Sequence, residues 1–230
     1  MTGIVYKSTG SWYTVKTPNG KFYECRIKGK FRIQGIKSTN PIAVGDVVEF
    51  DIETKNNTAT GVIKRIEERK NYIVRKSVNL SKQTHIIAAN IDLAFLLVTL
   101  DNPPTFTSFI DRFLATAEAY HIKAILLFNK VDLYDEALSE KKNKLIRIYE
   151  NIGYTCLEIS ATENININKV SELMLGKISM FSGHSGVGKS TLINAIEPSL
   201  NLKTKEVSKQ HKQGMHTTTF AEMFQLSFGG

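Results

Sequence analysis

A glycine-rich stretch from Gly183 to Ser190 constrains the fold of this chain more than any other part of its sequence. It reads GHSGVGKS and fits the pattern G-x-x-x-x-G-K-[ST], whose glycines let successive backbone N–H groups face a common centre. The apolar run 177–181 before it is typical of a strand, and residues 191–196 after it are typical of the first turns of a helix. A strand, a glycine loop and a helix in this order predict a binding site for nucleotide phosphates.

Two side chains of this loop have distinct predicted roles. Lys189 can reach the β- and γ-phosphates, and Ser190 can place its hydroxyl on Mg²⁺. The rest of the loop is expected to contact the nucleotide through backbone N–H groups and the positive end of the helix dipole. These further nucleotide-binding candidates are Gly183, His184, Ser185, Gly186, Val187, Gly188 and Thr191.

The N-terminal third of the chain has the pattern of an all-β domain. Short strand-like runs alternate with turns, and Asn19-Gly20 is a strong hairpin signal because both central residues of a type I′ turn need positive φ. Five strands fit a small OB-like barrel, a fold that binds oligonucleotides on an open face. The five runs are residues 3–6, 12–15, 22–27, 46–50 and 60–63.

Aromatic and basic residues are interleaved along the second and third of these runs. Adjacent residues of a strand point to opposite faces, so at most one of Trp12 and Tyr13 can be an exposed stacking platform. The same holds for Phe22 and Tyr23. The basic residues around them are Lys16, Lys21, Arg26, Lys28, Lys30 and Arg32.

The net charge of +8 belongs to the N-terminal part of the chain. Residues 1–76 hold 15 Lys and Arg residues against 7 Asp and Glu residues, whereas residues 77–230 hold 15 of each kind. A localised positive field favours a polyanionic partner, most simply nucleic acid. A lysine-rich surface that only keeps the protein soluble would give the same count, so charge alone leaves both interpretations open.

After a polar stretch with little periodicity, the pattern changes to alternating strands and helices. We therefore expect a barrel domain over residues 1–72, a linker over 73–84, and an α/β domain with a mainly parallel sheet over 85–230. The predicted strands of the α/β domain are 91–98, 124–128, 154–159, 177–181 and 220–226, and its predicted helices are 107–120, 135–151 and 168–175.

The ends and faces of two helices can also be predicted. Thr107 or Ser108 is a suitable N-cap for the first helix, and Gly153 is a suitable left-handed residue to end the second. The apolar face expected on the second helix consists of Leu138, Leu145, Ile148 and Ile152.

Two further motifs follow strands of the α/β domain. Asn129-Lys130-Val131-Asp132 comes directly after one strand and Ser160-Ala161 after the next, at the sheet edge where ligands of such folds bind. Asp132 could accept from guanine N1–H and the exocyclic amine, whereas adenine offers no such donor pair. Asn129 could hold the other edge of the base, and the stem of Lys130 could lie along its ring. The motifs together predict a GTP site.

Other features limit the kind of protein. No run of about 18 apolar residues and no signal-peptide core is present, so we expect a cytoplasmic protein that does not span a membrane. Cys25 and Cys156 are far apart in the sequence, which argues against a disulfide framework and leaves no four-ligand zinc spacing. Both are expected to be buried small hydrophobes.

The order of these motifs resembles a known family. The base motifs precede the phosphate loop, the reverse of ordinary small GTPases, and they lie behind a basic OB-like barrel. This arrangement, over essentially the whole chain, resembles the circularly permuted ribosome-small-subunit-dependent GTPase A family, RsgA or YjeQ. Gly214-x-His216-Thr217-Thr218-Thr219 also matches the first switch of that family, which usually has a longer polar residue where this chain has Met215.

The resemblance implies a GTPase that is stimulated by the small ribosomal subunit, contacts its rRNA and acts late in the subunit's maturation. GTP would be substrate and GDP product, Mg²⁺ would be held by Ser190 and Thr218, and the protein would be a monomer. The catalytic candidates are Lys189, Thr218 and His216; His216 could orient the attacking water or be a solvated histidine in a loop. The family continues into an Asp-x-x-Gly switch and a zinc domain, so we expect an incomplete chain with structural Zn²⁺ only in the missing region.

Two other functions stay open at this point. One is an RNA-binding module whose α/β domain binds GTP without hydrolysing it. The other is an ATPase acting on nucleic acid, which Asp132 and Ala161 argue against.

Overall fold

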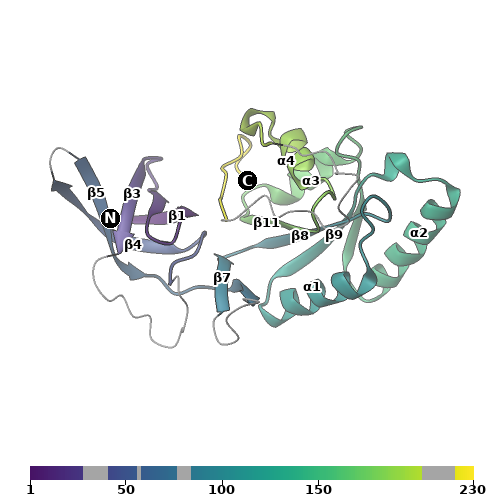
Figure 1. Ribbon diagram of the computed structural model, residues 1–230, viewed down its shortest axis with the longest axis horizontal. Helices are drawn as coiled ribbons and strands as arrows, with labels where there is room; N and C mark the ends of the chain where they lie inside the picture. The colour runs from purple at the N-terminus through teal and green to yellow at the C-terminus, as the bar shows by residue number, and fades with distance from the viewer. Residues whose placement is uncertain (28–40, 56–57, 77–83, 204–220) are drawn as a thin grey trace. The chain divides into compact units, whose positions relative to one another are not determined.

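The computed structural model of the chain describes residues 1–27, 41–55, 58–76, 84–203 and 221–230. The chain forms two compact units, one of residues 1–91 with the described part of 218–224, and one built from residue 92 onward with 225–230 (Figure 1). Each unit has its own apolar core.

The first unit contains a closed five-stranded barrel, as predicted. Its strand order is β1-β2-β3-β5-β4, and neighbours are antiparallel except β3 and β5. Side chains that alternate along the strands fill the interior, among them Val5, Val15 and Phe50. The strands are β1 Thr2–Ser8, β2 Tyr13–Lys16, β3 Phe22–Ile27, β4 Val47–Lys55 and β5 Thr58–Ile66.

The two cysteines differ in burial. Cys25 lies in the barrel core with no exposed surface, and burial raises the pKa of its thiol to about 12. Cys156 is only partly buried, although burial raises its thiol pKa to about 12 as well. Both thiols are therefore protonated at neutral pH, and Cys25 alone is fully inside a core.

The predicted linker contains regular structure. Strands β6 Tyr72–Lys76 and β7 Thr84–Ala89 pair antiparallel, and Ile73 and Ile86 are buried. The chain divides after Ile91, later than the predicted boundary. Composition alone concealed this hairpin, because the short apolar run of β6 stands between the charged residues 67–70 and the pair Arg75 and Lys76.

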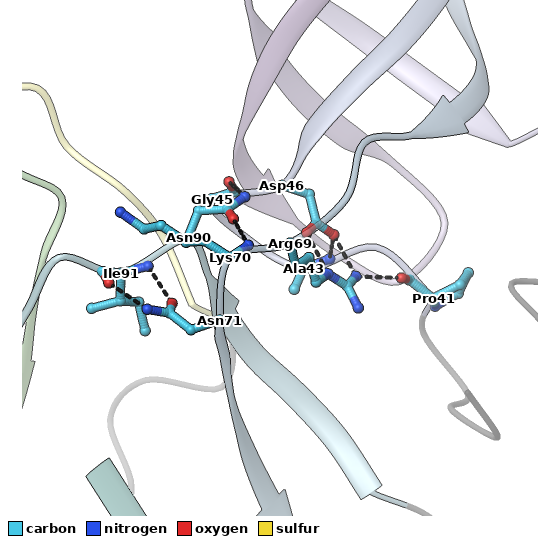
Figure 2. Close-up of polar contacts among 9 residues, drawn as sticks. All are labelled: Pro41, Ala43, Gly45, Asp46, Arg69, Lys70, Asn71, Asn90 and Ile91. Atoms are coloured by element: carbon cyan, nitrogen blue, oxygen red, sulfur yellow. Dashed lines mark hydrogen bonds and ion pairs between the residues drawn. The ribbon is translucent and has the colours of Figure 1, made fainter. Parts of the chain in front are cut away.

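A polar network joins the hairpin to the barrel (Figure 2). Arg69 makes two 2.6 Å hydrogen bonds to the Asp46 carboxylate, and the carboxylate also accepts from the backbone N–H of Ala43 at 2.8 Å. Gly45 has φ of +90°, and a Cβ there would lie 2.1 Å from the carbonyl oxygen of Ala89. Glycine is required at this position because the turn before β4 touches the backbone of β7.

Asparagine side chains extend the same network along the hairpin. Asn71 donates to the carbonyl of Ile91 and accepts from its N–H, both at 2.8 Å. Asn90 donates to the carbonyl of Gly45 at 2.9 Å and accepts from the N–H of Lys70 (Figure 2). These bonds fix the last residues of the first unit.

The second unit is an α/β fold. Its four strands have the order β10-β9-β8-β11 and are all parallel, which confirms the predicted parallel sheet. The strands are β8 Leu93–Val98, β9 Lys123–Phe128, β10 Thr155–Glu158 and β11 Ser179–Ser182. The helices are α1 Thr107–Ala119, η1 Val131–Leu133, α2 Glu136–Asn151, α3 Ile167–Met174, α4 Lys189–Ile196 and η2 Pro198–Leu200.

Helices cover both faces of this sheet. Helices α3 and α4 pack on one face through Val170, Met174 and Leu192, and α1 lies on the opposite side (Figure 1). The hydroxyl of Tyr149 in α2 donates to Asp111 of α1 at 2.9 Å, so α2 is tied to α1. The carboxyl ends of the strands are left for the loops that carry the motifs.

The helix details correct several predictions. Helix α1 has Phe106 as its N-cap and no side-chain cap bond, in place of the predicted Thr107 or Ser108. In α2 the predicted apolar face is wrong, because Ile148 and Ile152 are 46% and 63% exposed. The buried residues of α2 are Lys142 and Tyr149. Gly153 has φ of +96° and ends the helix as predicted.

The C-terminal segment also differs from expectation. The strand predicted over 220–226 is absent from its described part, 221–226, where residue 222 makes only an isolated antiparallel bridge to Lys7 of β1. The N–H of Met223 donates to the carbonyl of Tyr6 in the barrel at 2.8 Å, whereas the N–H of Leu226 donates to the carbonyl of Gly230 at 3.0 Å. No helix among the described residues is long and apolar enough to cross a membrane.

Candidate nucleotide-binding site

The phosphate loop joins β11 to α4, as the sequence predicts. Gly188 is the N-cap of α4, with φ of +97°, and a Cβ on it would lie 2.5 Å from Nδ2 of Asn129. A Cβ on Gly183 would meet the carbonyl oxygen of Leu97 at 2.9 Å. The loop therefore has this shape only with glycine at both positions, and its N–H groups lead into the positive end of a helix.

Lys189 is held inside the loop. Its Nζ donates to the carbonyls of Gly183 at 2.7 Å and His184 at 2.6 Å. Burial lowers the pKa of this ammonium group. An anion bound in the loop would reverse that effect, so the site favours a negatively charged ligand beside Lys189.

Asn129 connects the three motifs. Its side chain has 1% of its surface exposed, its Nδ2 donates to the carbonyl of Val187 at 2.8 Å, and its Oδ1 accepts from the N–H of Ala161 at 3.2 Å. The phosphate loop, the loop after β9 and the loop after β10 thus meet at one buried amide. Asn129 is engaged by protein atoms at both polar ends, but its amide group carries a second N–H, so its contact with the other edge of a base stays a prediction.

Lys130 and Asp132 lie on the open side of this junction. Lys130 has left-handed backbone, φ of 66°, and its Nζ donates to the carbonyl of Asn102 at 2.5 Å. Burial lowers the pKa of Lys130, which Asp101 and Asp132 partly offset. Asp132 is exposed in η1 and makes no hydrogen bond or ion pair with any residue that the structure describes. Its carboxylate is therefore available to a ligand.

Tyr134 is a site residue that the sequence prediction missed. Its hydroxyl donates to the carbonyl of Asn129 at 2.8 Å and accepts from the N–H of Leu100 at 2.9 Å. It links the loop after β8 to the base motif, two residues beyond Asp132. The one sequence signal for Tyr134 is its position as an aromatic residue just after a polar motif. That position does not reveal which groups its hydroxyl contacts.

His184 makes another contact that the sequence did not predict. Its ring lies against Phe109 of α1, with centroids 3.9 Å apart and planes 35° apart. Burial, together with the charges of Lys189 and Arg112, lowers the pKa of His184. The imidazole is therefore neutral at physiological pH and packs as an aromatic wall behind the loop.

The loop after β10 is fixed by its own bonds. Ser160 is fully buried, its Oγ accepts from the N–H of Glu163 at 3.1 Å, and it shares a 3.1 Å hydrogen bond with the hydroxyl of Thr162. Ser160 and Ile165 also exchange backbone bonds. This closed turn presents the backbone of Ala161 to Asn129.

The remaining predicted site residues divide into two groups. Ser190 and Thr191 stand in the first turn of α4 with partly exposed side chains. His216 and Thr218 lie outside the described residues, as do Lys28, Lys30 and Arg32 of the barrel. Among the described residues no cluster of three or more His, Cys, Asp or Glu could hold a metal ion.

Comparison with known proteins decides the family. The RsgA GTPase family profile matches residues 66–230, and the RsgA N-terminal domain profile matches residues 2–63. The chain belongs to the RsgA family. The small ribosomal subunit biogenesis GTPase RsgA of Flavobacterium johnsoniae is 68% identical over 228 residues, 99% of this chain and 70% of that protein. The RsgA of Bacteroides fragilis strain YCH46 is 55% identical over 230 residues, all of this chain and 73% of that protein.

Two solved structures have a similar fold. The crystal structure of YjeQ from Thermotoga maritima matches with a TM-score of 0.75 and 36% identity, and covers all of this chain and 72% of that one. YloQ, a circularly permuted GTPase, matches with a TM-score of 0.63 and 30% identity over 86% of this chain and 64% of that one. The fold is therefore a circularly permuted GTPase fold behind an N-terminal barrel.

Proposed function

We propose that this member of the RsgA family binds GTP and GDP where the phosphate loop meets the loops after β9 and β10, and hydrolyses GTP during small ribosomal subunit biogenesis. The observation that carries the proposal is the buried Asn129 amide, bonded to Val187 on one side and Ala161 on the other. It fixes the base-reading loop and the phosphate loop at one edge of the sheet, as a single ligand spanning both requires.

Guanine specificity belongs to Asp132 in this proposal. Its exposed carboxylate accepts from the N1–H and the exocyclic amine of guanine, and the stem of Lys130 lies along the ring. Asn129 braces the loops with one amide N–H and its oxygen, and its second N–H is proposed to hold the other edge of the base. Adenine would leave the carboxylate unpaired, which discriminates by about 10⁴ to 10⁵ in sites built around such donors.

The phosphates take the other end of the site. Lys189 would exchange one of its two hydrogen bonds to loop carbonyls for a contact with the β- and γ-phosphates and neutralise their charge. The backbone N–H groups of the loop would donate to the phosphate oxygens. The hydroxyl of Ser190 is a hard oxygen donor of the kind that Mg²⁺ accepts, and Thr218 is the second proposed ligand. Bound Mg²⁺ would neutralise phosphate charge. His216 is the proposed residue for orienting water.

The partners follow from the two units. The barrel contacts rRNA of the small subunit, and the GTPase unit controls binding and release. We propose a monomer that works in the cytoplasm, where these subunits are assembled. Structural Zn²⁺ would belong to a region outside this chain.

Turnover measurements test the enzymatic part of this proposal. GTP hydrolysis by the chain should accelerate when small ribosomal subunits are added, and Lys189→Ala should abolish the turnover at either condition, since hydrolysis is mostly positioning and charge neutralisation. GTP binding with no turnover in both conditions would favour the alternative, an RNA-binding module with a non-hydrolysing GTP domain. Turnover of ATP at the GTP rate would favour the ATPase instead.

A further inference from the structure

The charges on the outer surface of the barrel are not evenly paired. On β4 and β5 and the residues beside them, Lys64 pairs with Asp51, Arg65 with Glu49 at 3.3 Å and Glu67 at 2.6 Å, and Arg26 of β3 reaches Glu53 at 3.5 Å. By contrast, Lys16 of β2 and Lys21 before β3 form no ion pair with any described residue. Among the barrel side chains that the structure describes, the positive charge without an ion pair therefore lies along β2 and β3.

The same strands expose the aromatic rings. Trp12, immediately before β2, is 46% exposed and Phe22 of β3 is 55% exposed, whereas Tyr13, the neighbour of Trp12, is 1% exposed. Tyr23 is partly buried, with its ring 5.6 Å from that of Phe50 in the core. Alternation thus leaves Trp12 and Phe22 as the outward member of each pair, and the two rings line one surface depression, as contiguous exposed apolar groups at binding sites do.

These rings border a hollow next to the lysine. An open depression of about 540 Å³ is lined by Trp12, Phe22, Tyr23, Glu24, Ala59 and Thr60. The Nζ of Lys16 stands 5.5 Å from the centroid of Phe22 and 5.4 Å from that of Tyr6. Glu24 is the one acid in the lining, and it accepts a 2.7 Å hydrogen bond from Thr14. The hollow is apolar on its walls and cationic at one side.

We propose that this surface, consisting of Trp12, Lys16, Lys21 and Phe22, binds an unpaired segment of RNA. One base stacks on Trp12 in the hollow, another stacks on Phe22, and the two lysines neutralise phosphates between and beside them. Bases in a duplex already stack on each other and hide their faces, so an aromatic platform selects single strands. This inference rests on the proposed contact between the barrel and rRNA, and it names the face and the form of RNA.

The test uses the full chain and a fluorescent 12-nucleotide single-stranded RNA, with its duplex as competitor. Trp12 is the chain's one tryptophan, so its own emission reports stacking directly. RNA should quench that emission, and the single strand should bind more tightly than the duplex. Phe22→Ala and Trp12→Ala should each weaken single-strand binding by about 5- to 150-fold, the factor that corresponds to losing one stacked base.

Matched variants distinguish RNA binding at this surface from nonspecific attraction by the net positive charge of the protein. Lys16→Ala should reduce the slope of log Kd against log salt by about 0.7, whereas Lys64→Ala, on the paired face, should leave it unchanged. Phe106→Ala removes a ring that is 67% exposed in the other unit and should not change RNA binding. Thermal unfolding of each variant shows whether the barrel is intact.

Three outcomes would overturn the inference. RNA binding by the unmodified chain with no effect of Trp12→Ala and Phe22→Ala would move the contact elsewhere and leave the proposed rRNA contact standing. Tighter binding of an acidic peptide than of RNA, lost in Trp12→Ala, would assign the surface to a protein partner. No RNA binding by the unmodified chain would remove both this inference and the proposed rRNA contact.

Discussion

Gly188 shows how one residue can set the geometry of the whole site. Its φ is positive, and a Cβ attached to it would lie only 2.5 Å from Nδ2 of Asn129, which leaves no room for a side chain. Gly188→Ala should push the Asn129 amide away from Val187 and lower GDP affinity by at least tenfold, which titration calorimetry would measure. Displacing a buried hydrogen-bonded amide costs about 1–3 kcal/mol.

Gly153 supplies the control for that experiment. Its φ of +96° matches that of Gly188, but a Cβ on Gly153 would meet nothing within 4 Å. Gly153→Ala should therefore show the cost of backbone strain, seen as lower thermal stability, with GDP affinity unchanged. Equal losses of GDP affinity in the two variants would mean that the contact with Asn129 does not shape the site.

The sequence predicts the site residues that form contiguous motifs and misses those that act through distant partners. Asp132 and Lys189 are recognisable because the motif around each is local. The bracing contact of Asn129 joins it to Val187, 58 positions along the chain, and Tyr134 bridges Leu100 and Asn129. Such partners are set by the strand order of the sheet, which no local pattern encodes.

At the scale of elements, the pair of Arg69 and Asp46 fixes the β6–β7 hairpin against the barrel (Figure 2). The side chains are 8% and 0% exposed, and both bonds between them are 2.6 Å. Arg69→Met should lower the free energy of unfolding by about 3–5 kcal/mol, because it leaves a buried carboxylate without its partner. Urea unfolding, followed by the fluorescence of Trp12 in the first unit, would measure this loss of free energy.

An exposed arginine provides the comparison. Arg65 bonds to Glu49 and Glu67 but its side chain is 64% exposed, so Arg65→Met should cost less than about 1 kcal/mol. A loss of the same size in both variants would show that burial does not distinguish the two pairs and that the polar network of Figure 2 has no special role.

Element types were easier to predict than element faces. The strands of the barrel and the four strands and main helices of the α/β unit follow from hydrophobic runs and turn signals. The face of α2 does not, because the pattern counts residue types alone. Lys142 is buried with its amine paired to Glu158, while Ile148 stays exposed. A long basic side chain can take an interior position when its charge finds a partner, and no periodicity reveals that partner.

At the scale of the whole molecule, the order of motifs carried the most information. Base motifs before the phosphate loop, behind a basic barrel, pointed to the RsgA family, and the family profiles match both parts of the chain. Permutation leaves the packed sheet intact, since the strands keep their neighbours when the chain is reconnected elsewhere. Composition could not predict where the chain divides into two units, because the sequence of the β6–β7 hairpin resembles a polar linker.

The central claim is that Asp132 and the phosphate loop form one guanine nucleotide site, and equilibrium binding of GDP, ADP and XDP tests it most directly. The unmodified chain should prefer GDP to ADP by about 10⁴-fold or more. Asp132→Asn should prefer XDP to GDP, because an asparagine amide donates to the carbonyl that xanthine carries in place of the guanine amine. Equal dissociation constants for GDP and ADP in the unmodified chain would contradict the claim.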